Sequence, residues 1–261
     1  MNVSPVSPSP SLVAAPRAAV AEVFRSWQGE GLLLGRRMVF VRLAGCHVGC
    51  RYCDTAWAFD TPASVAVPGA RGERRANPLA LADVVALVDA ADPPGSPGGP
   101  APVAITGGEP CEQADVVAAL LAALAPRAVL LETAGLHRDE LLRLAPACRW
   151  VAADIKLPSA TGLPDVLERH ARVLESGALS GAGVFFKLVA DGDTTVDELA
   201  RAAALLARHA PRAPVFLQPV TPLGGSPALP RERLDALADA LLQAGLAVRV
   251  VPQVHKLLGV R

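Results

Sequence analysis

Three of the five cysteines in this 261-residue chain lie within eight residues, in the segment GCHVGCRYCDT at positions 45–55. Cys46, Cys50 and Cys53 form the spacing C-x3-C-x2-C. Thiolates this close can serve one centre if the loop wraps around it, and a [4Fe–4S] cluster is normally held by four of them. With three, one iron would lack a protein ligand and could bind a substrate or cofactor, like the open position of a catalytic zinc.

Zinc is the other metal that this loop could hold. Structural zinc takes four protein ligands, often in two separated pairs. His47 is too close to Cys46 to bind the same ion, so the fourth ligand would have to be the distant Cys111 or Cys148. We expect these two to be buried structural thiols instead. The odd, clustered set of cysteines also differs from the even, dispersed set of a secreted disulfide framework.

The bulk composition limits the class of protein. Lys+Arg and Asp+Glu both number 25, so we expect no nucleic-acid partner. Residues 1–16 are rich in Pro, Ser and Ala, do not resemble a signal peptide and are expected to form a disordered tail. No uninterrupted apolar run reaches about 18 residues, so we expect no membrane span. These features predict a cytoplasmic protein in which residues 17–261 form a single domain.

Short apolar runs alternate with longer helical patterns along the chain. Asn77 and Pro78 are expected to begin a helix, Thr195 and Glu198 fit a capping box, and Gly245 fits a helix end. The segments 60–78 and 92–102 are predicted loops, being rich in Gly and Pro. β-Branched and aromatic content predicts seven strands, at residues 38–43, 103–106, 128–132, 150–154, 184–189, 215–218 and 247–251.

This alternation predicts an α/β fold: a partial or distorted (β/α) barrel of about six to seven parallel strands with outer helices. In such folds the chemistry lies at the carboxyl ends of the strands. The cysteine loop, TGGEP at 106–110, ETAG at 132–135 and DIK at 154–156 each follow or end a predicted strand. We therefore expect these segments to meet at one site.

The cysteine spacing after the first barrel strand, with Tyr52 before the last cysteine, resembles the radical S-adenosylmethionine superfamily. TGGEP resembles that superfamily's glycine-rich segment, which meets the methionine ammonium group. The resemblance implies a [4Fe–4S] cluster whose open iron takes S-adenosylmethionine, and a 5′-deoxyadenosyl radical as the reactive species. The expected fold is thus a barrel of the radical S-adenosylmethionine type.

Residues 24–55, FRSWQGEGLLLGRRMVFVRLAGCHVGCRYCDT, resemble the 7-carboxy-7-deazaguanine synthases within that superfamily. ET-x-G, DIK-x-P-S, FK, QP and Q-x-H-K follow in the family's order, so the likeness spans about residues 20–256. The resemblance implies a lyase that converts 6-carboxy-5,6,7,8-tetrahydropterin to 7-carboxy-7-deazaguanine with loss of ammonia, in queuosine or other 7-deazapurine biosynthesis. It also implies Mg2+, a flavodoxin-type electron donor and a homodimer.

The residue types suit such a substrate, because a pterin has a flat donor and acceptor edge and this one has a carboxylate. Gln28 and Glu30 could bind the edge, Arg42 could hold the carboxylate, and Thr55 offers Mg2+ a hard oxygen. By resemblance, the substrate contacts are Trp27, Gln28, Gly29, Glu30, Arg42 and Thr106. The same resemblance implies S-adenosylmethionine contacts at Tyr52, Cys53, Asp54, Gly108, Asp154, Lys156 and Gln218.

Two other functions use the same loop. A glycyl-radical-enzyme activase shares the cysteines and GGEP but needs no residues for a pterin edge, which the WQGEG block would supply. A non-catalytic zinc or iron–sulfur protein needs only the cysteines. The sequence departs from the synthase pattern at Ala134, where asparagine is usual, and in its long loops 60–78 and 92–102. His255 and Lys256 could close the site or cap the last strand.

Overall fold

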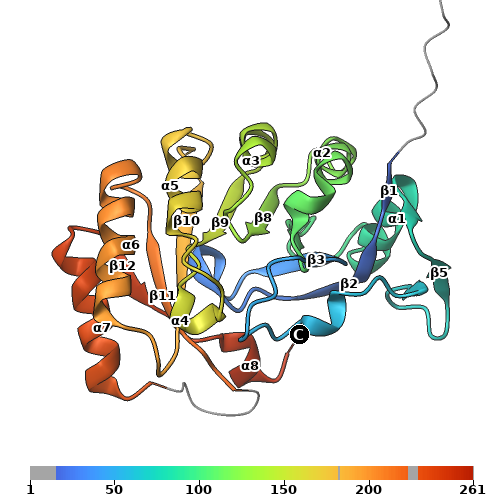
Figure 1. The fold of residues 1–261 in the computed structure, drawn as a ribbon. Helices are drawn as coiled ribbons and strands as arrows, with labels where there is room; N and C mark the ends of the chain where they lie inside the picture. Colours follow the sequence, from blue (N-terminus) through green and yellow to red (C-terminus); the bar gives the residue numbers. More distant parts are fainter. Residues whose placement is uncertain (1–15, 182, 223–228, 261) are drawn as a thin grey trace, which may run out of the picture.

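The computed structural model describes residues 16–181, 183–222 and 229–260. The predicted tail, apart from residue 16, lies outside the described residues. A sheet of eight strands forms the centre, in the order β12-β11-β10-β9-β8-β7-β3-β2 (Figure 1). All neighbours pair in parallel except β2 and β3. The two edge strands, β2 and β12, do not pair with each other, so the sheet is a partial barrel, as predicted.

All seven predicted strands are present, with ends shifted by one residue at most. Each lies beside its predecessor in the chain, so the sheet winds in one direction. They are β3 (Arg37–Leu43), β7 (Val103–Thr106), β8 (Val129–Thr133), β9 (Trp150–Asp154), β10 (Val184–Ala190), β11 (Val215–Pro219) and β12 (Val248–Val250).

Five further strands were not predicted. The longest is β2 (Val20–Trp27), which pairs antiparallel with β3. The predicted loop at 60–78 instead holds a hairpin, β4 (Ser64–Ala66) and β5 (Arg74–Ala76), whose polar sequence hid it. Short β1 (Arg17–Ala18) pairs with β6 (Leu79–Ala80).

Helices cover the outer face of the sheet, and α8 lies on the other side (Figure 1). The capping box of Thr195 and Glu198 is confirmed, and Gly245 follows the end of α7 as predicted. The helices are α1 (Leu81–Ala91), α2 (Ala114–Ala123), α3 (Arg138–Leu144), α4 (Pro158–Thr161), α5 (Leu167–Glu175), α6 (Val196–His209), α7 (Arg231–Gln243) and α8 (Val254–Leu258). No described helix is long and apolar enough to cross a membrane.

The predicted helix start at Asn77–Pro78 is wrong. Helix α1 begins at Leu81, and the Asn77–Pro78 peptide bond is cis. The Asn77 side chain bonds the backbone of Val20 at both its N–H and its carbonyl oxygen, and it also donates to the carbonyl of Pro62. The asparagine thus ties this segment to β2 instead of capping a helix.

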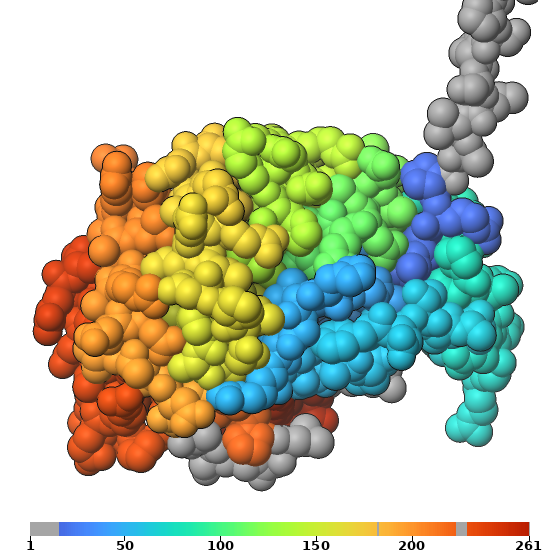
Figure 2. Space-filling model, viewed as in Figure 1, coloured from blue at the N-terminus to red at the C-terminus, as the bar shows by residue number. Residues whose placement is uncertain are grey.

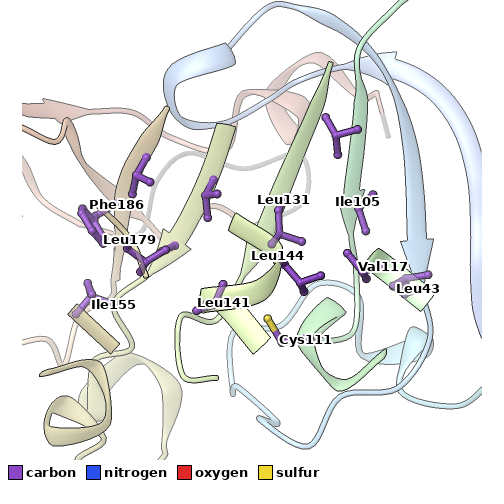
Figure 3. Close-up of a cluster of buried hydrophobic side chains, with 14 of the residues drawn as sticks. Leu43, Ile105, Cys111, Val117, Leu131, Leu141, Leu144, Ile155, Leu179 and Phe186 are labelled. Atoms are coloured by element: carbon purple, nitrogen blue, oxygen red, sulfur yellow. The ribbon is translucent and has the colours of Figure 1, made fainter. Parts of the chain in front are cut away.

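Alternation along the strands divides the core in two. Leu131 and Phe186 face the helices in the larger outer cluster (Figure 3). Their chain neighbours Leu130 and Phe185 point to the inner face of the partial barrel. The inner cluster also holds Phe24 stacked on Phe40, whose ring centroids are 5.1 Å apart.

Leu131→Ala should destabilise the protein by about 2 to 5 kcal/mol, because it leaves a cavity in the outer cluster at a fully buried position. Urea unfolding would measure the change. Leu142→Ala on α3, where the side chain is 40% exposed, is the matched control and should cost well under that. Equal losses in the two variants would contradict this description of the core.

Candidate active site

Every residue predicted to bind the cluster, cofactor, substrate or Mg2+ lines one cavity on the inner face of the partial barrel. Six parallel strands build it in the same way. Each contributes an apolar residue of the inner cluster and, two positions later, a polar residue that lines the cavity. The pairs are Phe40 and Arg42, Ala104 and Thr106, Leu130 and Glu132, Ala152 and Asp154, Phe185 and Lys187, and Phe216 and Gln218. The apolar members pack together beneath the cavity as its floor, and Phe40 is the one of them that also lines it.

The cysteine loop is held over this cavity by backbone contacts. Gly45 N–H donates to Ala58 O at 2.9 Å, and Arg51 N–H donates to Thr161 O at 2.8 Å. In Figure 2 the blue segment near residue 50 lies against the yellow segment around α4. Gly108 of TGGEP packs so tightly that a Cβ there would lie 2.0 Å from Gly45 O. With a φ of 49°, this position requires glycine on both counts.

The cysteine side chains fit a cluster better than a single ion. Cys46, Cys50 and Cys53 are free, half-buried and line the cavity. Each thiolate of a [4Fe–4S] site binds a different iron, so the sulfurs surround the cluster and need not converge on a point. Among the described residues, no three His, Cys, Asp or Glu side chains are grouped as a single-ion site. Cys111 and Cys148 do not line the cavity, which argues against them as fourth ligands.

Burial raises the pKa of the Cys46 and Cys50 thiols above its ordinary value. The same effect raises the pKa of Cys148 to about 12. A bound iron would lower the pKa of the loop thiols again, since a coordinated thiol is deprotonated outright.

A second feature of the cavity fits a missing polar ligand. Gln218 is 2% exposed, and its Oε1 is the one buried side-chain oxygen or nitrogen in the described residues with no hydrogen-bond partner. A buried, unpartnered amide oxygen costs free energy unless a ligand donates to it. Gln218 is one of the predicted S-adenosylmethionine contacts, and the ammonium or adenine N–H groups of that cofactor are suitable donors.

Three polar side chains lie in contact on the side of the cavity that is predicted to bind the cofactor. Lys156 Nζ lies 2.7 Å from Asp154 Oδ2 and 3.2 Å from the Tyr52 hydroxyl. Burial alone would lower the pKa of Lys156, but the Asp154 carboxylate outweighs it and raises the pKa well above its ordinary value. The reciprocal attraction overcomes burial and lowers the pKa of Asp154. Both groups are therefore charged.

The side of the cavity that is predicted to bind the substrate is built around Glu132, which appeared in the sequence only as part of ET-x-G. Gln28 Nε2 donates to Glu132 Oε1 at 2.8 Å, and Thr106 Oγ1 donates to Glu132 Oε2 at 2.5 Å. Gln28 Oε1 accepts from Glu30 N–H at 3.1 Å. Gly31 lies against Phe185 of the floor, so the loop after β2 folds over the inner face. Glu132 thus fixes two predicted substrate contacts.

Arg42 has a partner within the chain. Its Nε lies 3.0 Å from Glu22 Oε1, and its guanidinium lies over the Phe24 ring, 5.7 Å from the centroid. Gly107 packs against the Arg42 side chain, where a Cβ would lie 1.9 Å from Cγ. Glu22 occupies the Nε position, so a substrate carboxylate would meet the two terminal nitrogens.

The C-terminal segment closes the cavity and answers the question left open for His255 and Lys256. Lys256 Nζ lies 3.0 Å from Asp54 Oδ2, and His255 lines the cavity beside Gly29. Gln253 Nε2 donates to Glu30 Oε1 at 3.0 Å and to Asp54 Oδ2 at 3.2 Å. Burial raises the pKa of Asp54, but His255 and Lys256 outweigh it and lower the pKa overall.

Glu109 of TGGEP is the contact that sequence reasoning missed most completely. Its buried carboxylate accepts from Cys111 N–H at 3.0 Å, the Thr133 hydroxyl at 2.7 Å and Ala134 N–H at 2.6 Å. Its backbone N–H donates to Gly45 O at 2.9 Å. One residue therefore joins the loops after β3, β7 and β8.

Glu109→Ala should lower the free energy of unfolding by about 3 kcal/mol or more, because it strands three buried donors. Urea unfolding of the cluster-free protein would measure this loss, and reconstitution should then give less bound iron per chain. Glu232→Ala, at an exposed position in the first turn of α7, is the control. Wild-type stability of the Glu109 variant would show that the carboxylate does not hold these loops.

His170 on α5 supports the cofactor side from behind. Its Nε2 accepts from Lys156 N–H at 2.9 Å, and its Nδ1 lies 3.1 Å from Gly135 O, so Nδ1 carries the proton of a neutral ring. Burial lowers the pKa of His170 to about 4.

Acid should therefore destabilise the fold through His170. An unfolded histidine takes up a proton near its ordinary pKa of about 6.5, whereas the folded one resists until about pH 4. The penalty is negligible above about pH 7 and reaches about 2 kcal/mol by about pH 5. His170→Gln should lose this component, seen as a smaller fall in urea midpoint between those two pH values. An equal fall in both proteins would contradict the assignment.

Comparison with known proteins places these residues in a family. No family model matches the chain. It is 35% identical to the 7-carboxy-7-deazaguanine synthase of Geobacter sulfurreducens, over 94% of this chain and 98% of the relative. It is 32% identical to the synthase of Thermococcus kodakarensis, over 94% of this chain and 99% of the relative.

Solved structures agree on the fold. The crystal structure of QueE from Escherichia coli matches with a TM-score of 0.56 at 23% identity, covering 90% of this chain and 93% of that one. A radical SAM methyltransferase from Sphaerobacter thermophilus matches with a TM-score of 0.57 at 19% identity, covering 84% and 70%. Because these relatives are at least 30% identical over nearly the whole chain, the chain belongs to the family of 7-carboxy-7-deazaguanine synthases.

Proposed function

We propose that this chain converts 6-carboxy-5,6,7,8-tetrahydropterin to 7-carboxy-7-deazaguanine, with ring contraction and loss of ammonia. The observation that carries the proposal is that one cavity gathers all the residues predicted for this reaction, from loops and strands spread over residues 27–218. Family membership makes the chain an enzyme of 7-deazapurine biosynthesis. A glycyl-radical activase or a non-catalytic metal protein would have no use for the substrate side built on Gln28, Glu30 and Glu132.

The cysteine loop would hold the [4Fe–4S] cluster through Cys46, Cys50 and Cys53. With S-adenosylmethionine bound, the cluster would supply the 5′-deoxyadenosyl radical that starts the reaction. The polar groups of the cofactor would meet Gln218 Oε1, the backbone at Gly108 and the charged pair of Asp154 and Lys156.

The substrate would lie across the other half of the cavity. Glu30 and Gln28 present acceptors and a donor to the pterin edge, and Thr106 and Glu132 hold the Gln28 amide in orientation. Arg42 would pair with the substrate carboxylate through its terminal nitrogens. Trp27 and Gly29 also line the cavity. His255 packs against Gly29 and leaves no room there for a side chain.

The proposed reaction also needs Mg2+ and an electron donor, and we propose that the enzyme is a homodimer. Thr55 Oγ1, 3.6 Å from Cys53 Sγ, offers Mg2+ one oxygen, with substrate and water supplying the others. A flavodoxin-type protein would deliver the electron. At least half of the surface of Trp57, Leu257 and Leu258 is exposed. In the proposed homodimer, a second copy of the chain would pack against these apolar side chains. We place the reaction in the cytoplasm.

Anaerobic reconstitution tests the proposal directly. The protein should bind about four irons per chain, cleave S-adenosylmethionine on reduction and form the deazaguanine from the carboxytetrahydropterin. Zinc binding without such cleavage, or cleavage with no deazaguanine product, would overturn it. Cleavage without this product would indicate that the enzyme catalyses another radical reaction.

Arg42→Ala should raise the KM for the carboxytetrahydropterin by roughly 30- to 150-fold, equivalent to about 2 to 3 kcal/mol, because a charge-assisted contact to its carboxylate is lost. Iron content and S-adenosylmethionine cleavage without substrate should be unchanged. Arg138→Ala, at an exposed position on α3, is the control. Loss of the cluster in the Arg42 variant would refute the assigned role.

A further inference from the structure

The use of lysine in this chain is uneven. The sequence has 25 basic residues, of which only Lys156, Lys187 and Lys256 are lysines. Lys156 and Lys187 line the cavity, and Lys256 contacts Asp54, which lines it. Lysine offers a compact charge with three donors where arginine offers a broad planar fork. Lys156 and Lys256 have partners in the groups already described, whereas Lys187 has been given no role.

Lys187 lies in the polar layer between the two halves of the cavity. Its Nζ is 2.5 Å from Glu30 Oε2, on the substrate side, and 3.3 Å from Asp154 Oδ1, on the cofactor side. The register of the sheet pairs Lys187 with Asp154 across β10 and β9. The Glu132 carboxylate also acts on its charge. One ammonium group therefore faces three carboxylates in a buried site.

Charge balance makes this cation necessary. Two carboxylates in a water-poor site repel each other, and burial favours the protonated form of each. With Lys187 present, burial would raise the pKa of Glu30, but the lysine outweighs it and lowers the pKa. Without Lys187, Asp154 keeps Lys156 at 2.7 Å, whereas Glu30 keeps a direct contact to the neutral Gln253. Glu30 is therefore the carboxylate that would take up a proton.

We propose that Lys187 is a positioning residue that keeps Glu30 ionised, and so preserves it as a hydrogen-bond acceptor for the N–H edge of the substrate. The inference rests on the proposed function and adds to it the group that sets the charge of the substrate-binding carboxylate. A protonated Glu30 would present a hydroxyl to the ligand N–H groups and lose one acceptor. Lys187 acts on the substrate only through Glu30.

The groups that face Glu30 come from β10 and from the segment around α8. Lys187 approaches from β10, and Asp154 on β9 and Glu132 on β8 act on Lys187. His255 and Gln253 approach from the segment around α8, and Gln253 links Glu30 to Asp54 of the cysteine loop. In a Lys187 variant, His255 is the titratable group left to favour an ionised Glu30, among the described neighbours.

Equilibrium binding of 6-carboxypterin tests the proposal without turnover. This fluorescent pterin has the same N–H edge and carboxylate, and it would be titrated into the anaerobic, reconstituted enzyme with S-adenosylmethionine at several values between about pH 6 and about pH 9. The ratio of dissociation constants, variant over wild type, is taken at each pH so that titration of the probe cancels. The variants are Lys187→Met and Lys187→Arg, with Lys187→Gln as a second neutral variant should the Met protein not fold.

For the neutral variants we expect a ratio of about tenfold or more near pH 6, equivalent to about 1.4 kcal/mol, and this ratio should fall toward one as Glu30 ionises with rising pH. Lys187→Arg keeps the charge in a bulkier group, so its ratio should exceed one but not vary with pH. A pH-independent ratio in the neutral variants, or a pH-dependent one in the Arg variant, would overturn the inference.

The same data separate this inference from the proposed function. If the wild-type enzyme neither binds the probe nor turns over the carboxytetrahydropterin, the proposed function fails. If the wild-type enzyme does both and the neutral variants show a flat ratio, the proposed function stands and the role of Lys187 is wrong.

Discussion

The two-residue alternation of the strands is the constraint on which the rest of the site depends. Each of six parallel strands places an apolar side chain on the inner face and a polar one two residues further on. The apolar residues pack together and remove water from the base of the cavity. The polar residues above them are thereby held in a site of low dielectric, where each charge needs a partner.

The charged side chains meet that need in an alternating series across the cavity. Tyr52, Lys156, Asp154, Lys187 and Glu30 follow one another by direct contact. Gln253 continues the series to Asp54, which Lys256 neutralises. Such a series fixes rotamers as well as charges, because each group is held from two sides. It also means that a ligand that engages one member changes the surroundings of the next.

Sequence reasoning found the seven parallel strands because they are short runs rich in apolar, β-branched and aromatic residues, and it found the cysteine loop because thiolate spacing has few other uses. It missed β2 and the β4–β5 hairpin, whose residues mix polar and apolar types without a distinct period. It also passed over Lys187 and Glu132. Both stand two residues after an apolar inner residue, in FFK and LLE, as the chosen Arg42 and Asp154 do. Glu109 could not be found in this way, since its partners lie 2, 24 and 25 residues away in the chain.

The open sheet is joined at its mouth by a backbone hydrogen bond and a side-chain contact instead of strand pairing. The edge strands β2 and β12 lie at opposite ends of the sheet order. The residues that follow them nevertheless meet, because Val254 N–H donates to Gly29 O at 3.0 Å and Gln253 bonds Glu30. Figure 1 shows α8 on the side of the sheet away from the outer helices. A closed ladder would have joined the edges through a row of backbone hydrogen bonds, whereas this joint consists of a few hydrogen bonds around the Glu30 carboxylate. The residues that join the two edges of the sheet are therefore also residues that line the cavity.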